Sequence, residues 1–196
     1  RDVPMWADAN LPPLAAATAA CALLAAARSA TVGLPCVETA AAPFTDGRWL
    51  FSHNGVVPGW PDSMVGLART LPVRDLLTLD APTDSALLWA LVRQALAAGA
   101  SAAGALAGTV RRVRAAVPAA RLNLLLLGRD VLAATAVGHA LWVRVAGGAT
   151  TVASEPVDDA TSWRPVPEGR LVEVPAGAVH HDQFIRPLPT DDTGGI

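Results

Sequence analysis

The chain of 196 residues contains no lysine and no tyrosine, so arginine supplies all 15 of its basic side chains. With 17 acidic residues the net charge is only −2, which favours neither nucleic acid nor an anionic membrane as a partner. Its two cysteines, Cys21 and Cys36, are too few for a disulfide scaffold or a four-ligand zinc site. We therefore expect a protein of the reducing cytoplasm that needs no metal and no cofactor.

The chain also lacks a long hydrophobic run. Its alanine-rich stretch at 14–27 is too short and too weakly apolar to span a bilayer. Asp2 and Asp8 precede that stretch where a secretory signal peptide would carry basic residues, which argues against processing. The first residue is Arg1 rather than methionine, and we expect a leading segment of the natural protein to precede it.

Hydrophobic residues make up 52% of the sequence, enough for the core of a single domain over residues 1–196. Two helices are predicted in its middle. Thr83 is a typical N-cap, Asp84 lies in the first turn, and apolar residues follow at helical spacing until Gly99. A second helix is predicted from Ser101 to about residue 116.

Short segments surround this helical pair. Before it we predict a helix at 10–19, a buried strand at 21–28, a loop at 31–43, a strand at 48–53 and a helix at 61–71. After it we predict strands at 122–127, 131–137, 140–145, 150–153, 170–174 and 184–188. Strands, then two adjacent helices, then strands indicate an α+β fold in layers rather than a βαβ alternation.

The predicted strand at 48–53 runs into Asn54 and Gly55. A strand that stops on Asn-Gly presents a side-chain amide and a backbone N–H side by side, and two such donors can stabilise the oxyanion of an acyl-transfer reaction. Gly55 would leave no Cβ between its N–H and a substrate. Asn-Gly is also a common two-residue hairpin turn, so a purely structural turn is the alternative interpretation.

Four short motifs follow one another along the chain. They are Arg-Ser-Ala-Thr-Val-Gly at 28–33, Ser-His-Asn-Gly at 52–55, Thr-Asp-Ser at 83–85 and Ala-Ser-Glu-Pro at 153–156. Their order and spacing resemble the class II glutamine amidotransferases, a branch of the N-terminal nucleophile hydrolases. The resemblance covers nearly the whole chain. It implies the four-layer αββα sandwich of that family, here without its leading strand and its nucleophile.

Further pieces resemble the members of that family that are plain hydrolases. They are Ala-Pro-Phe at 42–44, Gly-Arg-Trp at 47–49, Leu-Asn-Leu-Leu at 122–125, Asp-Asp at 158–159 and Trp163. The resemblance implies an amidohydrolase that releases glutamate from the γ-glutamyl conjugate of a histidine-derived thiol precursor. Two alternatives stay open: a glutaminase domain that delivers ammonia to a partner synthetase, and a noncatalytic γ-glutamyl-binding homologue.

The resemblance also implies a mechanism. In this family an N-terminal cysteine attacks the γ-glutamyl amide and its own α-amine serves as general base. Asn54 Nδ2 and the Gly55 N–H match the family's pair of oxyanion donors.

Four more residues are assigned to the substrate pocket by the same resemblance. Arg28 would bind the α-carboxylate of the glutamyl group, and Thr31 would support that carboxylate. Asp84 would accept the α-ammonium. His53 is expected to act through hydrogen bonds rather than as a general base, because the nucleophile's own amine takes the proton.

The nucleophile itself is absent from the sequence as given. Cys21 lies in an apolar run and is expected to pack as a small hydrophobe, while Cys36 has neither a terminal amine nor a marked electropositive setting. We expect this polypeptide to be hydrolytically inactive. It is either a fragment, which we favour, or a degenerate homologue that binds without cleaving.

The remaining candidates are given structural roles. Ser154 and Glu155 are expected to brace the pocket at a strand end. His180 and His181 are adjacent in sequence, and adjacent residues on a strand point to opposite faces, so they do not predict a metal site. Four tryptophans could contact a cationic ligand but are expected mostly to pack in the core: Trp49, Trp60, Trp89 and Trp163.

Overall fold

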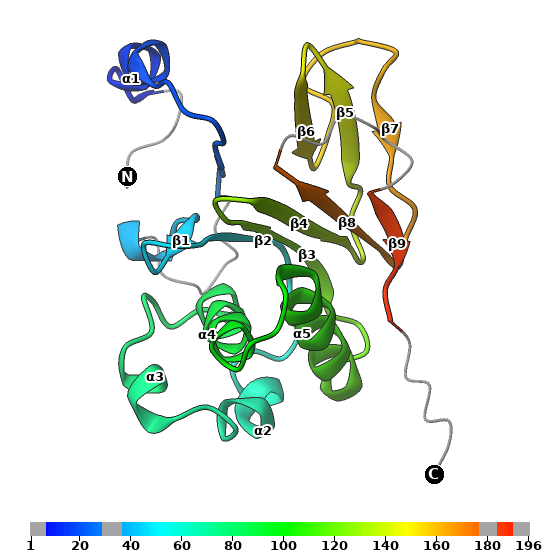
Figure 1. Cartoon of the computed structure of the whole chain (residues 1–196). Coiled ribbons are helices and arrows are strands. Elements are labelled where there is room, and N and C mark those ends of the chain that lie inside the picture. The colour runs from blue at the N-terminus through cyan, green and yellow to red at the C-terminus, as the bar shows by residue number, and fades with distance from the viewer. Residues whose placement is uncertain (1–6, 29–36, 177–183, 190–196) are drawn as a thin grey trace.

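The computed structural model describes residues 7–28, 37–176 and 184–189. Figure 1 shows two sheets on top of each other, with helices below the larger one. The larger sheet has the strand order β1-β2-β3-β4-β8-β9, and the smaller has the order β6-β5-β7. Every neighbouring pair is antiparallel. The strands of the larger sheet are β1 Phe44–Thr45, β2 Leu50–Val56, β3 Arg121–Leu127, β4 Val131–Ala136, β8 Arg170–Pro175 and β9 Ile185–Pro187; those of the smaller are β5 Trp142–Ala146, β6 Ala149–Ala153 and β7 Arg164–Pro165.

The helical layer consists mainly of α4 (Asp84–Ala97) and α5 (Ala102–Ala116). Both begin where the sequence predicts. Thr83 Oγ1 accepts a hydrogen bond from the Ala86 N–H, and Ser101 Oγ accepts one from the Gly104 N–H. Each cap satisfies a backbone donor that the first helical turn would otherwise leave without a partner.

Shorter helices lie around this pair. They are α1 (Leu11–Ala17), α2 (Val65–Ala68) and α3 (Val73–Leu77), with single 3₁₀ turns at Glu38–Ala40 and Asp62–Met64. The helix predicted at 61–71 is therefore divided into a 3₁₀ turn and one α-helical turn. No helix in the described ranges is long and apolar enough to cross a membrane.

Two apolar clusters lie on opposite faces of the larger sheet. Leu122, Leu124 and Leu126 of β3 pack with the buried faces of α4 and α5. The other face of the sheet packs against the smaller sheet through Ala134 of β4 and Val143 of β5. The period of two along a strand sends alternate side chains to the two clusters, so both faces of the sheet are buried.

The α+β class with antiparallel sheets is confirmed. A helical layer, the six-stranded sheet and the three-stranded sheet form three successive layers (Figure 1). α1 has no buried residue and stands apart from both sheets, so the outer helical layer expected on the smaller sheet has no counterpart among the described residues.

The strand predicted at 21–28 is wrong. Residues 21–28 form no strand, and nearly all of them are exposed. Cys21 is exposed rather than packed as a small hydrophobe, and Leu23 retains 64% of its accessible surface. A run of small apolar residues becomes a buried strand only when a neighbouring strand pairs with it, and this segment pairs with none in the described part of the chain.

The predicted end of the strand at Asn54-Gly55 is also wrong. β2 continues to Val56, and Asn54 and Gly55 lie opposite Asn123 and Leu122 of β3. This pairing excludes the hairpin-turn interpretation. The Asn-Gly pair lies inside a strand of the larger sheet.

Candidate active site

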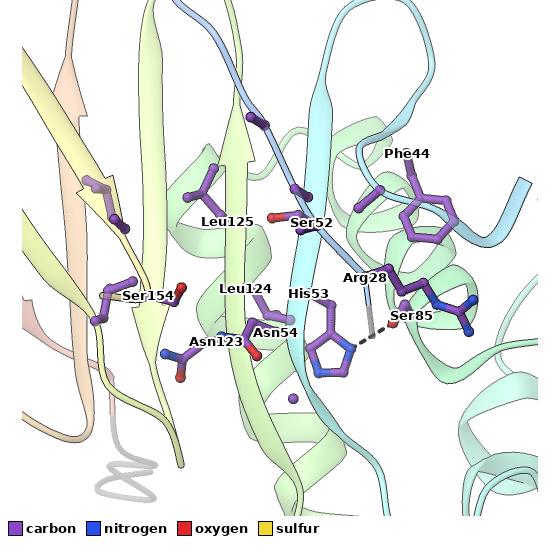
Figure 2. A pocket seen from close by; sticks show the side chains of 18 of the residues that line it. Arg28, Phe44, Ser52, His53, Asn54, Ser85, Asn123, Leu124, Leu125 and Ser154 are labelled. Atoms are coloured by element: carbon purple, nitrogen blue, oxygen red, sulfur yellow. Dashed lines mark hydrogen bonds between the residues drawn. The ribbon is translucent and has the colours of Figure 1, made fainter. Parts of the chain in front are cut away.

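The candidate site is a cavity of about 530 Å³ beside β2. β1 pairs only with Leu50 and Phe51, so no described strand covers the edge of β2 from Ser52 to Val56. The cavity opens along this edge (Figure 2). Four of the segments that line it are 25–28, residues 52–55 of β2, the start of α4 at 83–85, and residues 152–155 at the end of β6; residues 123–125 of β3 and Leu141 also line it, as do Ala40, Ala42 and Phe44.

The Gly55 N–H points to this open edge. The Leu122 N–H donates to the Val137 carbonyl on the β4 side, so the backbone groups of Asn123, one residue on, face β2. Asn54 lies opposite Asn123 and therefore directs its own N–H to β3. Because these directions alternate along a strand, Gly55 directs its N–H away from β3 and along the uncovered edge.

Asn54 presents its side chain beside that edge. It is exposed and points to the face of β2 opposite His53, together with Asn123 across the strand pair (Figure 2). Asn123 is fully engaged: its Nδ2 donates to the His139 and Ala140 carbonyls, and its Oδ1 accepts from the Val137 N–H. Asn123 therefore fixes the 137–140 turn, while the amide of Asn54 remains directed at the cavity.

Asp84 holds the start of α4 against the same edge of β2. Its Oδ2 accepts the Val57 N–H at 3.0 Å, and its Oδ1 accepts the Ser85 N–H at 2.8 Å. Only 5% of the residue is exposed. Since Val57 lies two residues after Gly55, the carboxylate of Asp84 is one strand repeat, about 7 Å, from the level of the Gly55 N–H.

His53 links α4 to β3 through both ring nitrogens. Nε2 lies 2.9 Å from the Arg121 carbonyl oxygen, which can only accept, so Nε2 carries the proton. Nδ1, 2.9 Å from Ser85 Oγ, then accepts the hydroxyl proton of Ser85. Burial lowers the pKa of His53 below its usual 6.5 and outweighs the raising effects of the Arg121 carbonyl and the Asp84 charge. The imidazole is neutral and serves as a structural bridge at neutral pH.

Gly55 is required by this bridge. A Cβ at position 55 would collide with the Arg121 carbonyl oxygen and lie 2.7 Å from His53 Nε2. The sequence suggested that a glycine here leaves room for a substrate. That remains a prediction, and the structure adds a second reason for glycine: the crowded neighbours are the carbonyl and the imidazole that hold β2, β3 and α4 together.

The structure describes some, but not all, of the other residues that the sequence predicts in the site. Arg28 lines the cavity, and in Figure 2 its side chain extends toward Ser85 and Phe44 rather than toward Asn54. Ser154 and Glu155 line the opposite wall. Thr31, Cys36, His180 and His181 lie outside the described residues.

The tryptophans do not line this cavity. Trp89 is fully buried in the helical layer and stacks on Phe51 with ring centroids 5.4 Å apart. Trp163 donates its indole N–H to Asp158, and Trp49 borders a second cavity of about 360 Å³ together with Cys21. Among the described residues no group of three or more histidine, cysteine, aspartate or glutamate side chains could hold a metal ion.

Ser85 and the Arg121 carbonyl are the contributors that the sequence did not reveal. Ser85 lies within the Thr-Asp-Ser motif, so the sequence marks it as a candidate. Its hydrogen-bond partner His53, however, is 32 positions away, and the motif does not indicate that contact. The Arg121 carbonyl is a main-chain group 68 positions from His53, and no residue type marks it.

No family model matches the chain. The chain is similar to the gamma-glutamyl-hercynylcysteine sulfoxide hydrolase of Mycolicibacterium smegmatis, with 38% identity over 173 residues that cover 88% of this chain and 69% of that protein. The protein of the same name from Mycobacterium tuberculosis is 40% identical over 171 residues, which cover 87% of this chain and 66% of that protein. The chain thus spans about two thirds of the length of these relatives.

Solved structures show the fold. A glutamine aminotransferase class-II domain protein from Silicibacter pomeroyi superimposes with a TM-score of 0.69 and 22% sequence identity, over 96% of this chain and 84% of that one. The glutamine phosphoribosylpyrophosphate amidotransferase from B. subtilis gives a TM-score of 0.52 at 14% identity, over 73% of this chain and 29% of that one. The fold is that of the class II glutamine amidotransferase domain.

The neutral state of His53 predicts a pH dependence of stability. Because its pKa is lower in the folded chain than in the unfolded one, the unfolded chain binds more protons as the pH falls below about 6.5. The free energy of unfolding, measured by urea denaturation, should therefore fall between pH 7 and pH 5. His53→Gln, which cannot titrate, should show a shallower fall over this range; an equal slope would contradict the neutral bridge.

The crowding at position 55 predicts the effect of a single methyl group. Gly55→Ala should lower the free energy of unfolding by about 3 kcal/mol, because the neighbouring carbonyl belongs to the main chain of β3 and cannot swing away. Gly108→Ala is the matched control, since its Cβ would meet nothing within 4 Å inside α5 and should stabilise by about 0.5–1 kcal/mol. Equal urea midpoints for the two variants would refute the argument.

Proposed function

Because the chain belongs to the family of gamma-glutamyl-hercynylcysteine sulfoxide hydrolases, we propose that its cavity binds the γ-glutamyl group of that substrate class for hydrolysis. The observation that carries the proposal is the meeting of Asn54, Gly55, Asp84 and Arg28 on one cavity. They come from three separate segments of the chain. An amide-cleaving site for glutamyl groups needs both a pair of oxyanion donors and two opposite charges for the amino-acid end.

Asn54 and Gly55 would stabilise the tetrahedral intermediate. The scissile carbonyl would lie at the uncovered edge of β2, where the Gly55 N–H points and the Asn54 amide is exposed. As the nucleophile adds to that carbonyl, its oxygen becomes an oxyanion and takes hydrogen bonds from both donors. The Gly55 N–H is a main-chain donor held in a β-strand, so it needs little reorganisation when the charge develops.

Asp84 and Arg28 would bind the α-ammonium and the α-carboxylate. Both of these substrate groups are attached to one carbon, so their partners must lie at the same end of the cavity. Arg28 lines the cavity together with Asp84 and Ser85, and in Figure 2 its side chain extends away from Asn54. Each carboxylate oxygen of Asp84 accepts one N–H and keeps a further lone pair for an ammonium donor.

The bridge made by His53 would set the distance between these two functions. It fixes the start of α4, which carries Asp84, to the two strands around Gly55. His53 is thus a positioning residue in this proposal. The carbon chain of a glutamyl group can span the one strand repeat that separates the level of Asp84 from the Gly55 N–H.

The nucleophile in this proposal is the N-terminal cysteine that the family resemblance implies, and no described residue is assigned that role. Its sulfur would bond to the γ-carbonyl carbon, and the amide C–N bond would break as the α-amine passes the proton to the leaving nitrogen. Water would then hydrolyse the thioester and release glutamate. Cys21, the cysteine that the structure describes, borders the second cavity and takes no part.

Glutamate release tests the proposal in the protein that carries this cysteine. We expect hydrolysis of gamma-glutamyl-hercynylcysteine sulfoxide to be much faster than hydrolysis of glutamine. Asn54→Ala should lower kcat by about 100- to 1,000-fold, since it removes one of two oxyanion donors. Asn10→Ala, which removes an exposed amide that makes no capping bond in α1, should leave kcat unchanged.

Two results would contradict the proposed function. Preference for glutamine over the γ-glutamyl conjugate would instead support the glutaminase alternative. An Asn54→Ala variant that is as active as the parent would show that Asn54 is no oxyanion donor.

A further inference from the structure

The two ends of the cavity differ in what they can bind. In the proposed function, on which this inference rests, the glutamyl group extends from the Asn54–Gly55 donors toward Asp84 and Arg28. The leaving group is attached on the other side of the scissile carbonyl. It must therefore occupy the part of the cavity that lies away from the start of α4.

That part lies between the two sheets. Its floor is the face of the larger sheet that carries Ser52, Asn54, Asn123 and Leu125, which lie opposite one another in two register pairs. Its other wall comes from the smaller sheet, through Leu141 and residues 152–155. Ser154 lies on the same side of β2 as Asn54 and Asn123 in Figure 2.

Glu155 is the charged residue in the part of the cavity between the two sheets, and its charge is negative. The ionised side chains that line the described cavity are Arg28, Asp84 and Glu155, and the first two lie at the glutamyl end. Glu155 is exposed, and no other residue in the described ranges gives it a hydrogen bond or an ion pair. Around it the wall is small or apolar: Leu141, Val152, Ala153 and Ser154.

We propose that Glu155 selects substrates whose leaving group carries a fixed positive charge. A lone carboxylate on an otherwise apolar wall attracts a cation, and it needs no hydrogen-bond donor from the ligand. A quaternary ammonium fits this description, since it has charge and apolar methyl groups but no N–H. The hercynyl group in the names of the relatives contains such a trimethylammonium.

A pair of isosteric substrates tests this specificity in the protein that carries the N-terminal cysteine. One is the γ-glutamyl amide of 4-(2-trimethylammonioethyl)aniline, and the other is the γ-glutamyl amide of 4-(3,3-dimethylbutyl)aniline; the two-carbon spacer keeps the charge from altering the reactivity of the amide. They have the same shape and differ by one positive charge. The wild-type protein should hydrolyse the cationic anilide with a kcat/KM about two- to fivefold higher.

Glu155→Gln should abolish this preference by slowing the cationic anilide only, with kcat/KM for the neutral anilide unchanged. Asp159→Asn is the matched control: it removes the same charge four residues away and outside the cavity lining, and should keep the preference. Absence of a preference in the wild type, or an undiminished preference in Glu155→Gln, would overturn the role of Glu155 and leave the proposed function intact. Failure of the wild type to cleave the natural conjugate would overturn the proposed function and this inference with it. Cleavage of the natural conjugate and of the neutral anilide, but not of the cationic anilide, would overturn the role of Glu155 alone.

Discussion

The hydrogen bond from the Val57 N–H to the Asp84 carboxylate connects the two elements that form the site. It joins the first turn of α4 to the end of β2 at 3.0 Å, in a place where only 5% of Asp84 is exposed. A buried hydrogen bond to a charged group contributes about 1.5–3 kcal/mol, and loss of the carboxylate would leave a buried N–H without a partner. The position of α4 along the open edge of β2 follows from this bond.

The rest of the site is arranged along three alternate residues, two of them in β2 and the third directly after its end. His53 sends its side chain to Ser85 and to the Arg121 carbonyl, Gly55 has no side chain because that carbonyl fills the space, and Val57 sends its N–H to Asp84. Through His53 and Val57, this part of the chain is thus fixed to the start of α4. Asn54, between them in sequence, points to the opposite face and remains exposed. The structural and the proposed catalytic groups alternate along a single strand.

Much of this could be predicted from the sequence. Thr83 and Asp84 identify the start of α4 by local chemistry alone, because a capping hydroxyl and a first-turn carboxylate act on neighbouring backbone groups. The layered α+β order follows from the succession of strands and helices. The four motifs identified the family, and the polar residues assigned to the site from them that the structure describes all line one cavity.

What could not be predicted depends on partners distant in the sequence. The apolar run at 21–28 has the composition of a buried strand, but no strand pairs with it among the described residues, so Cys21 and Leu23 are exposed. The reason for glycine at position 55 lies in the main-chain carbonyl of Arg121, which carries no sequence signal. Asn54 and Gly55 look like the end of a strand or a hairpin turn until β3 is found opposite them.

The structure of the chain with bound L-glutamate tests the central claim most directly, because glutamate is the product the proposed reaction releases. The account predicts the α-ammonium against Asp84, the α-carboxylate against Arg28, and one γ-carboxylate oxygen about 3 Å from both Asn54 Nδ2 and the Gly55 nitrogen. Glutamate bound with its γ-carboxylate away from Asn54 and Gly55, or bound outside this cavity, would contradict it.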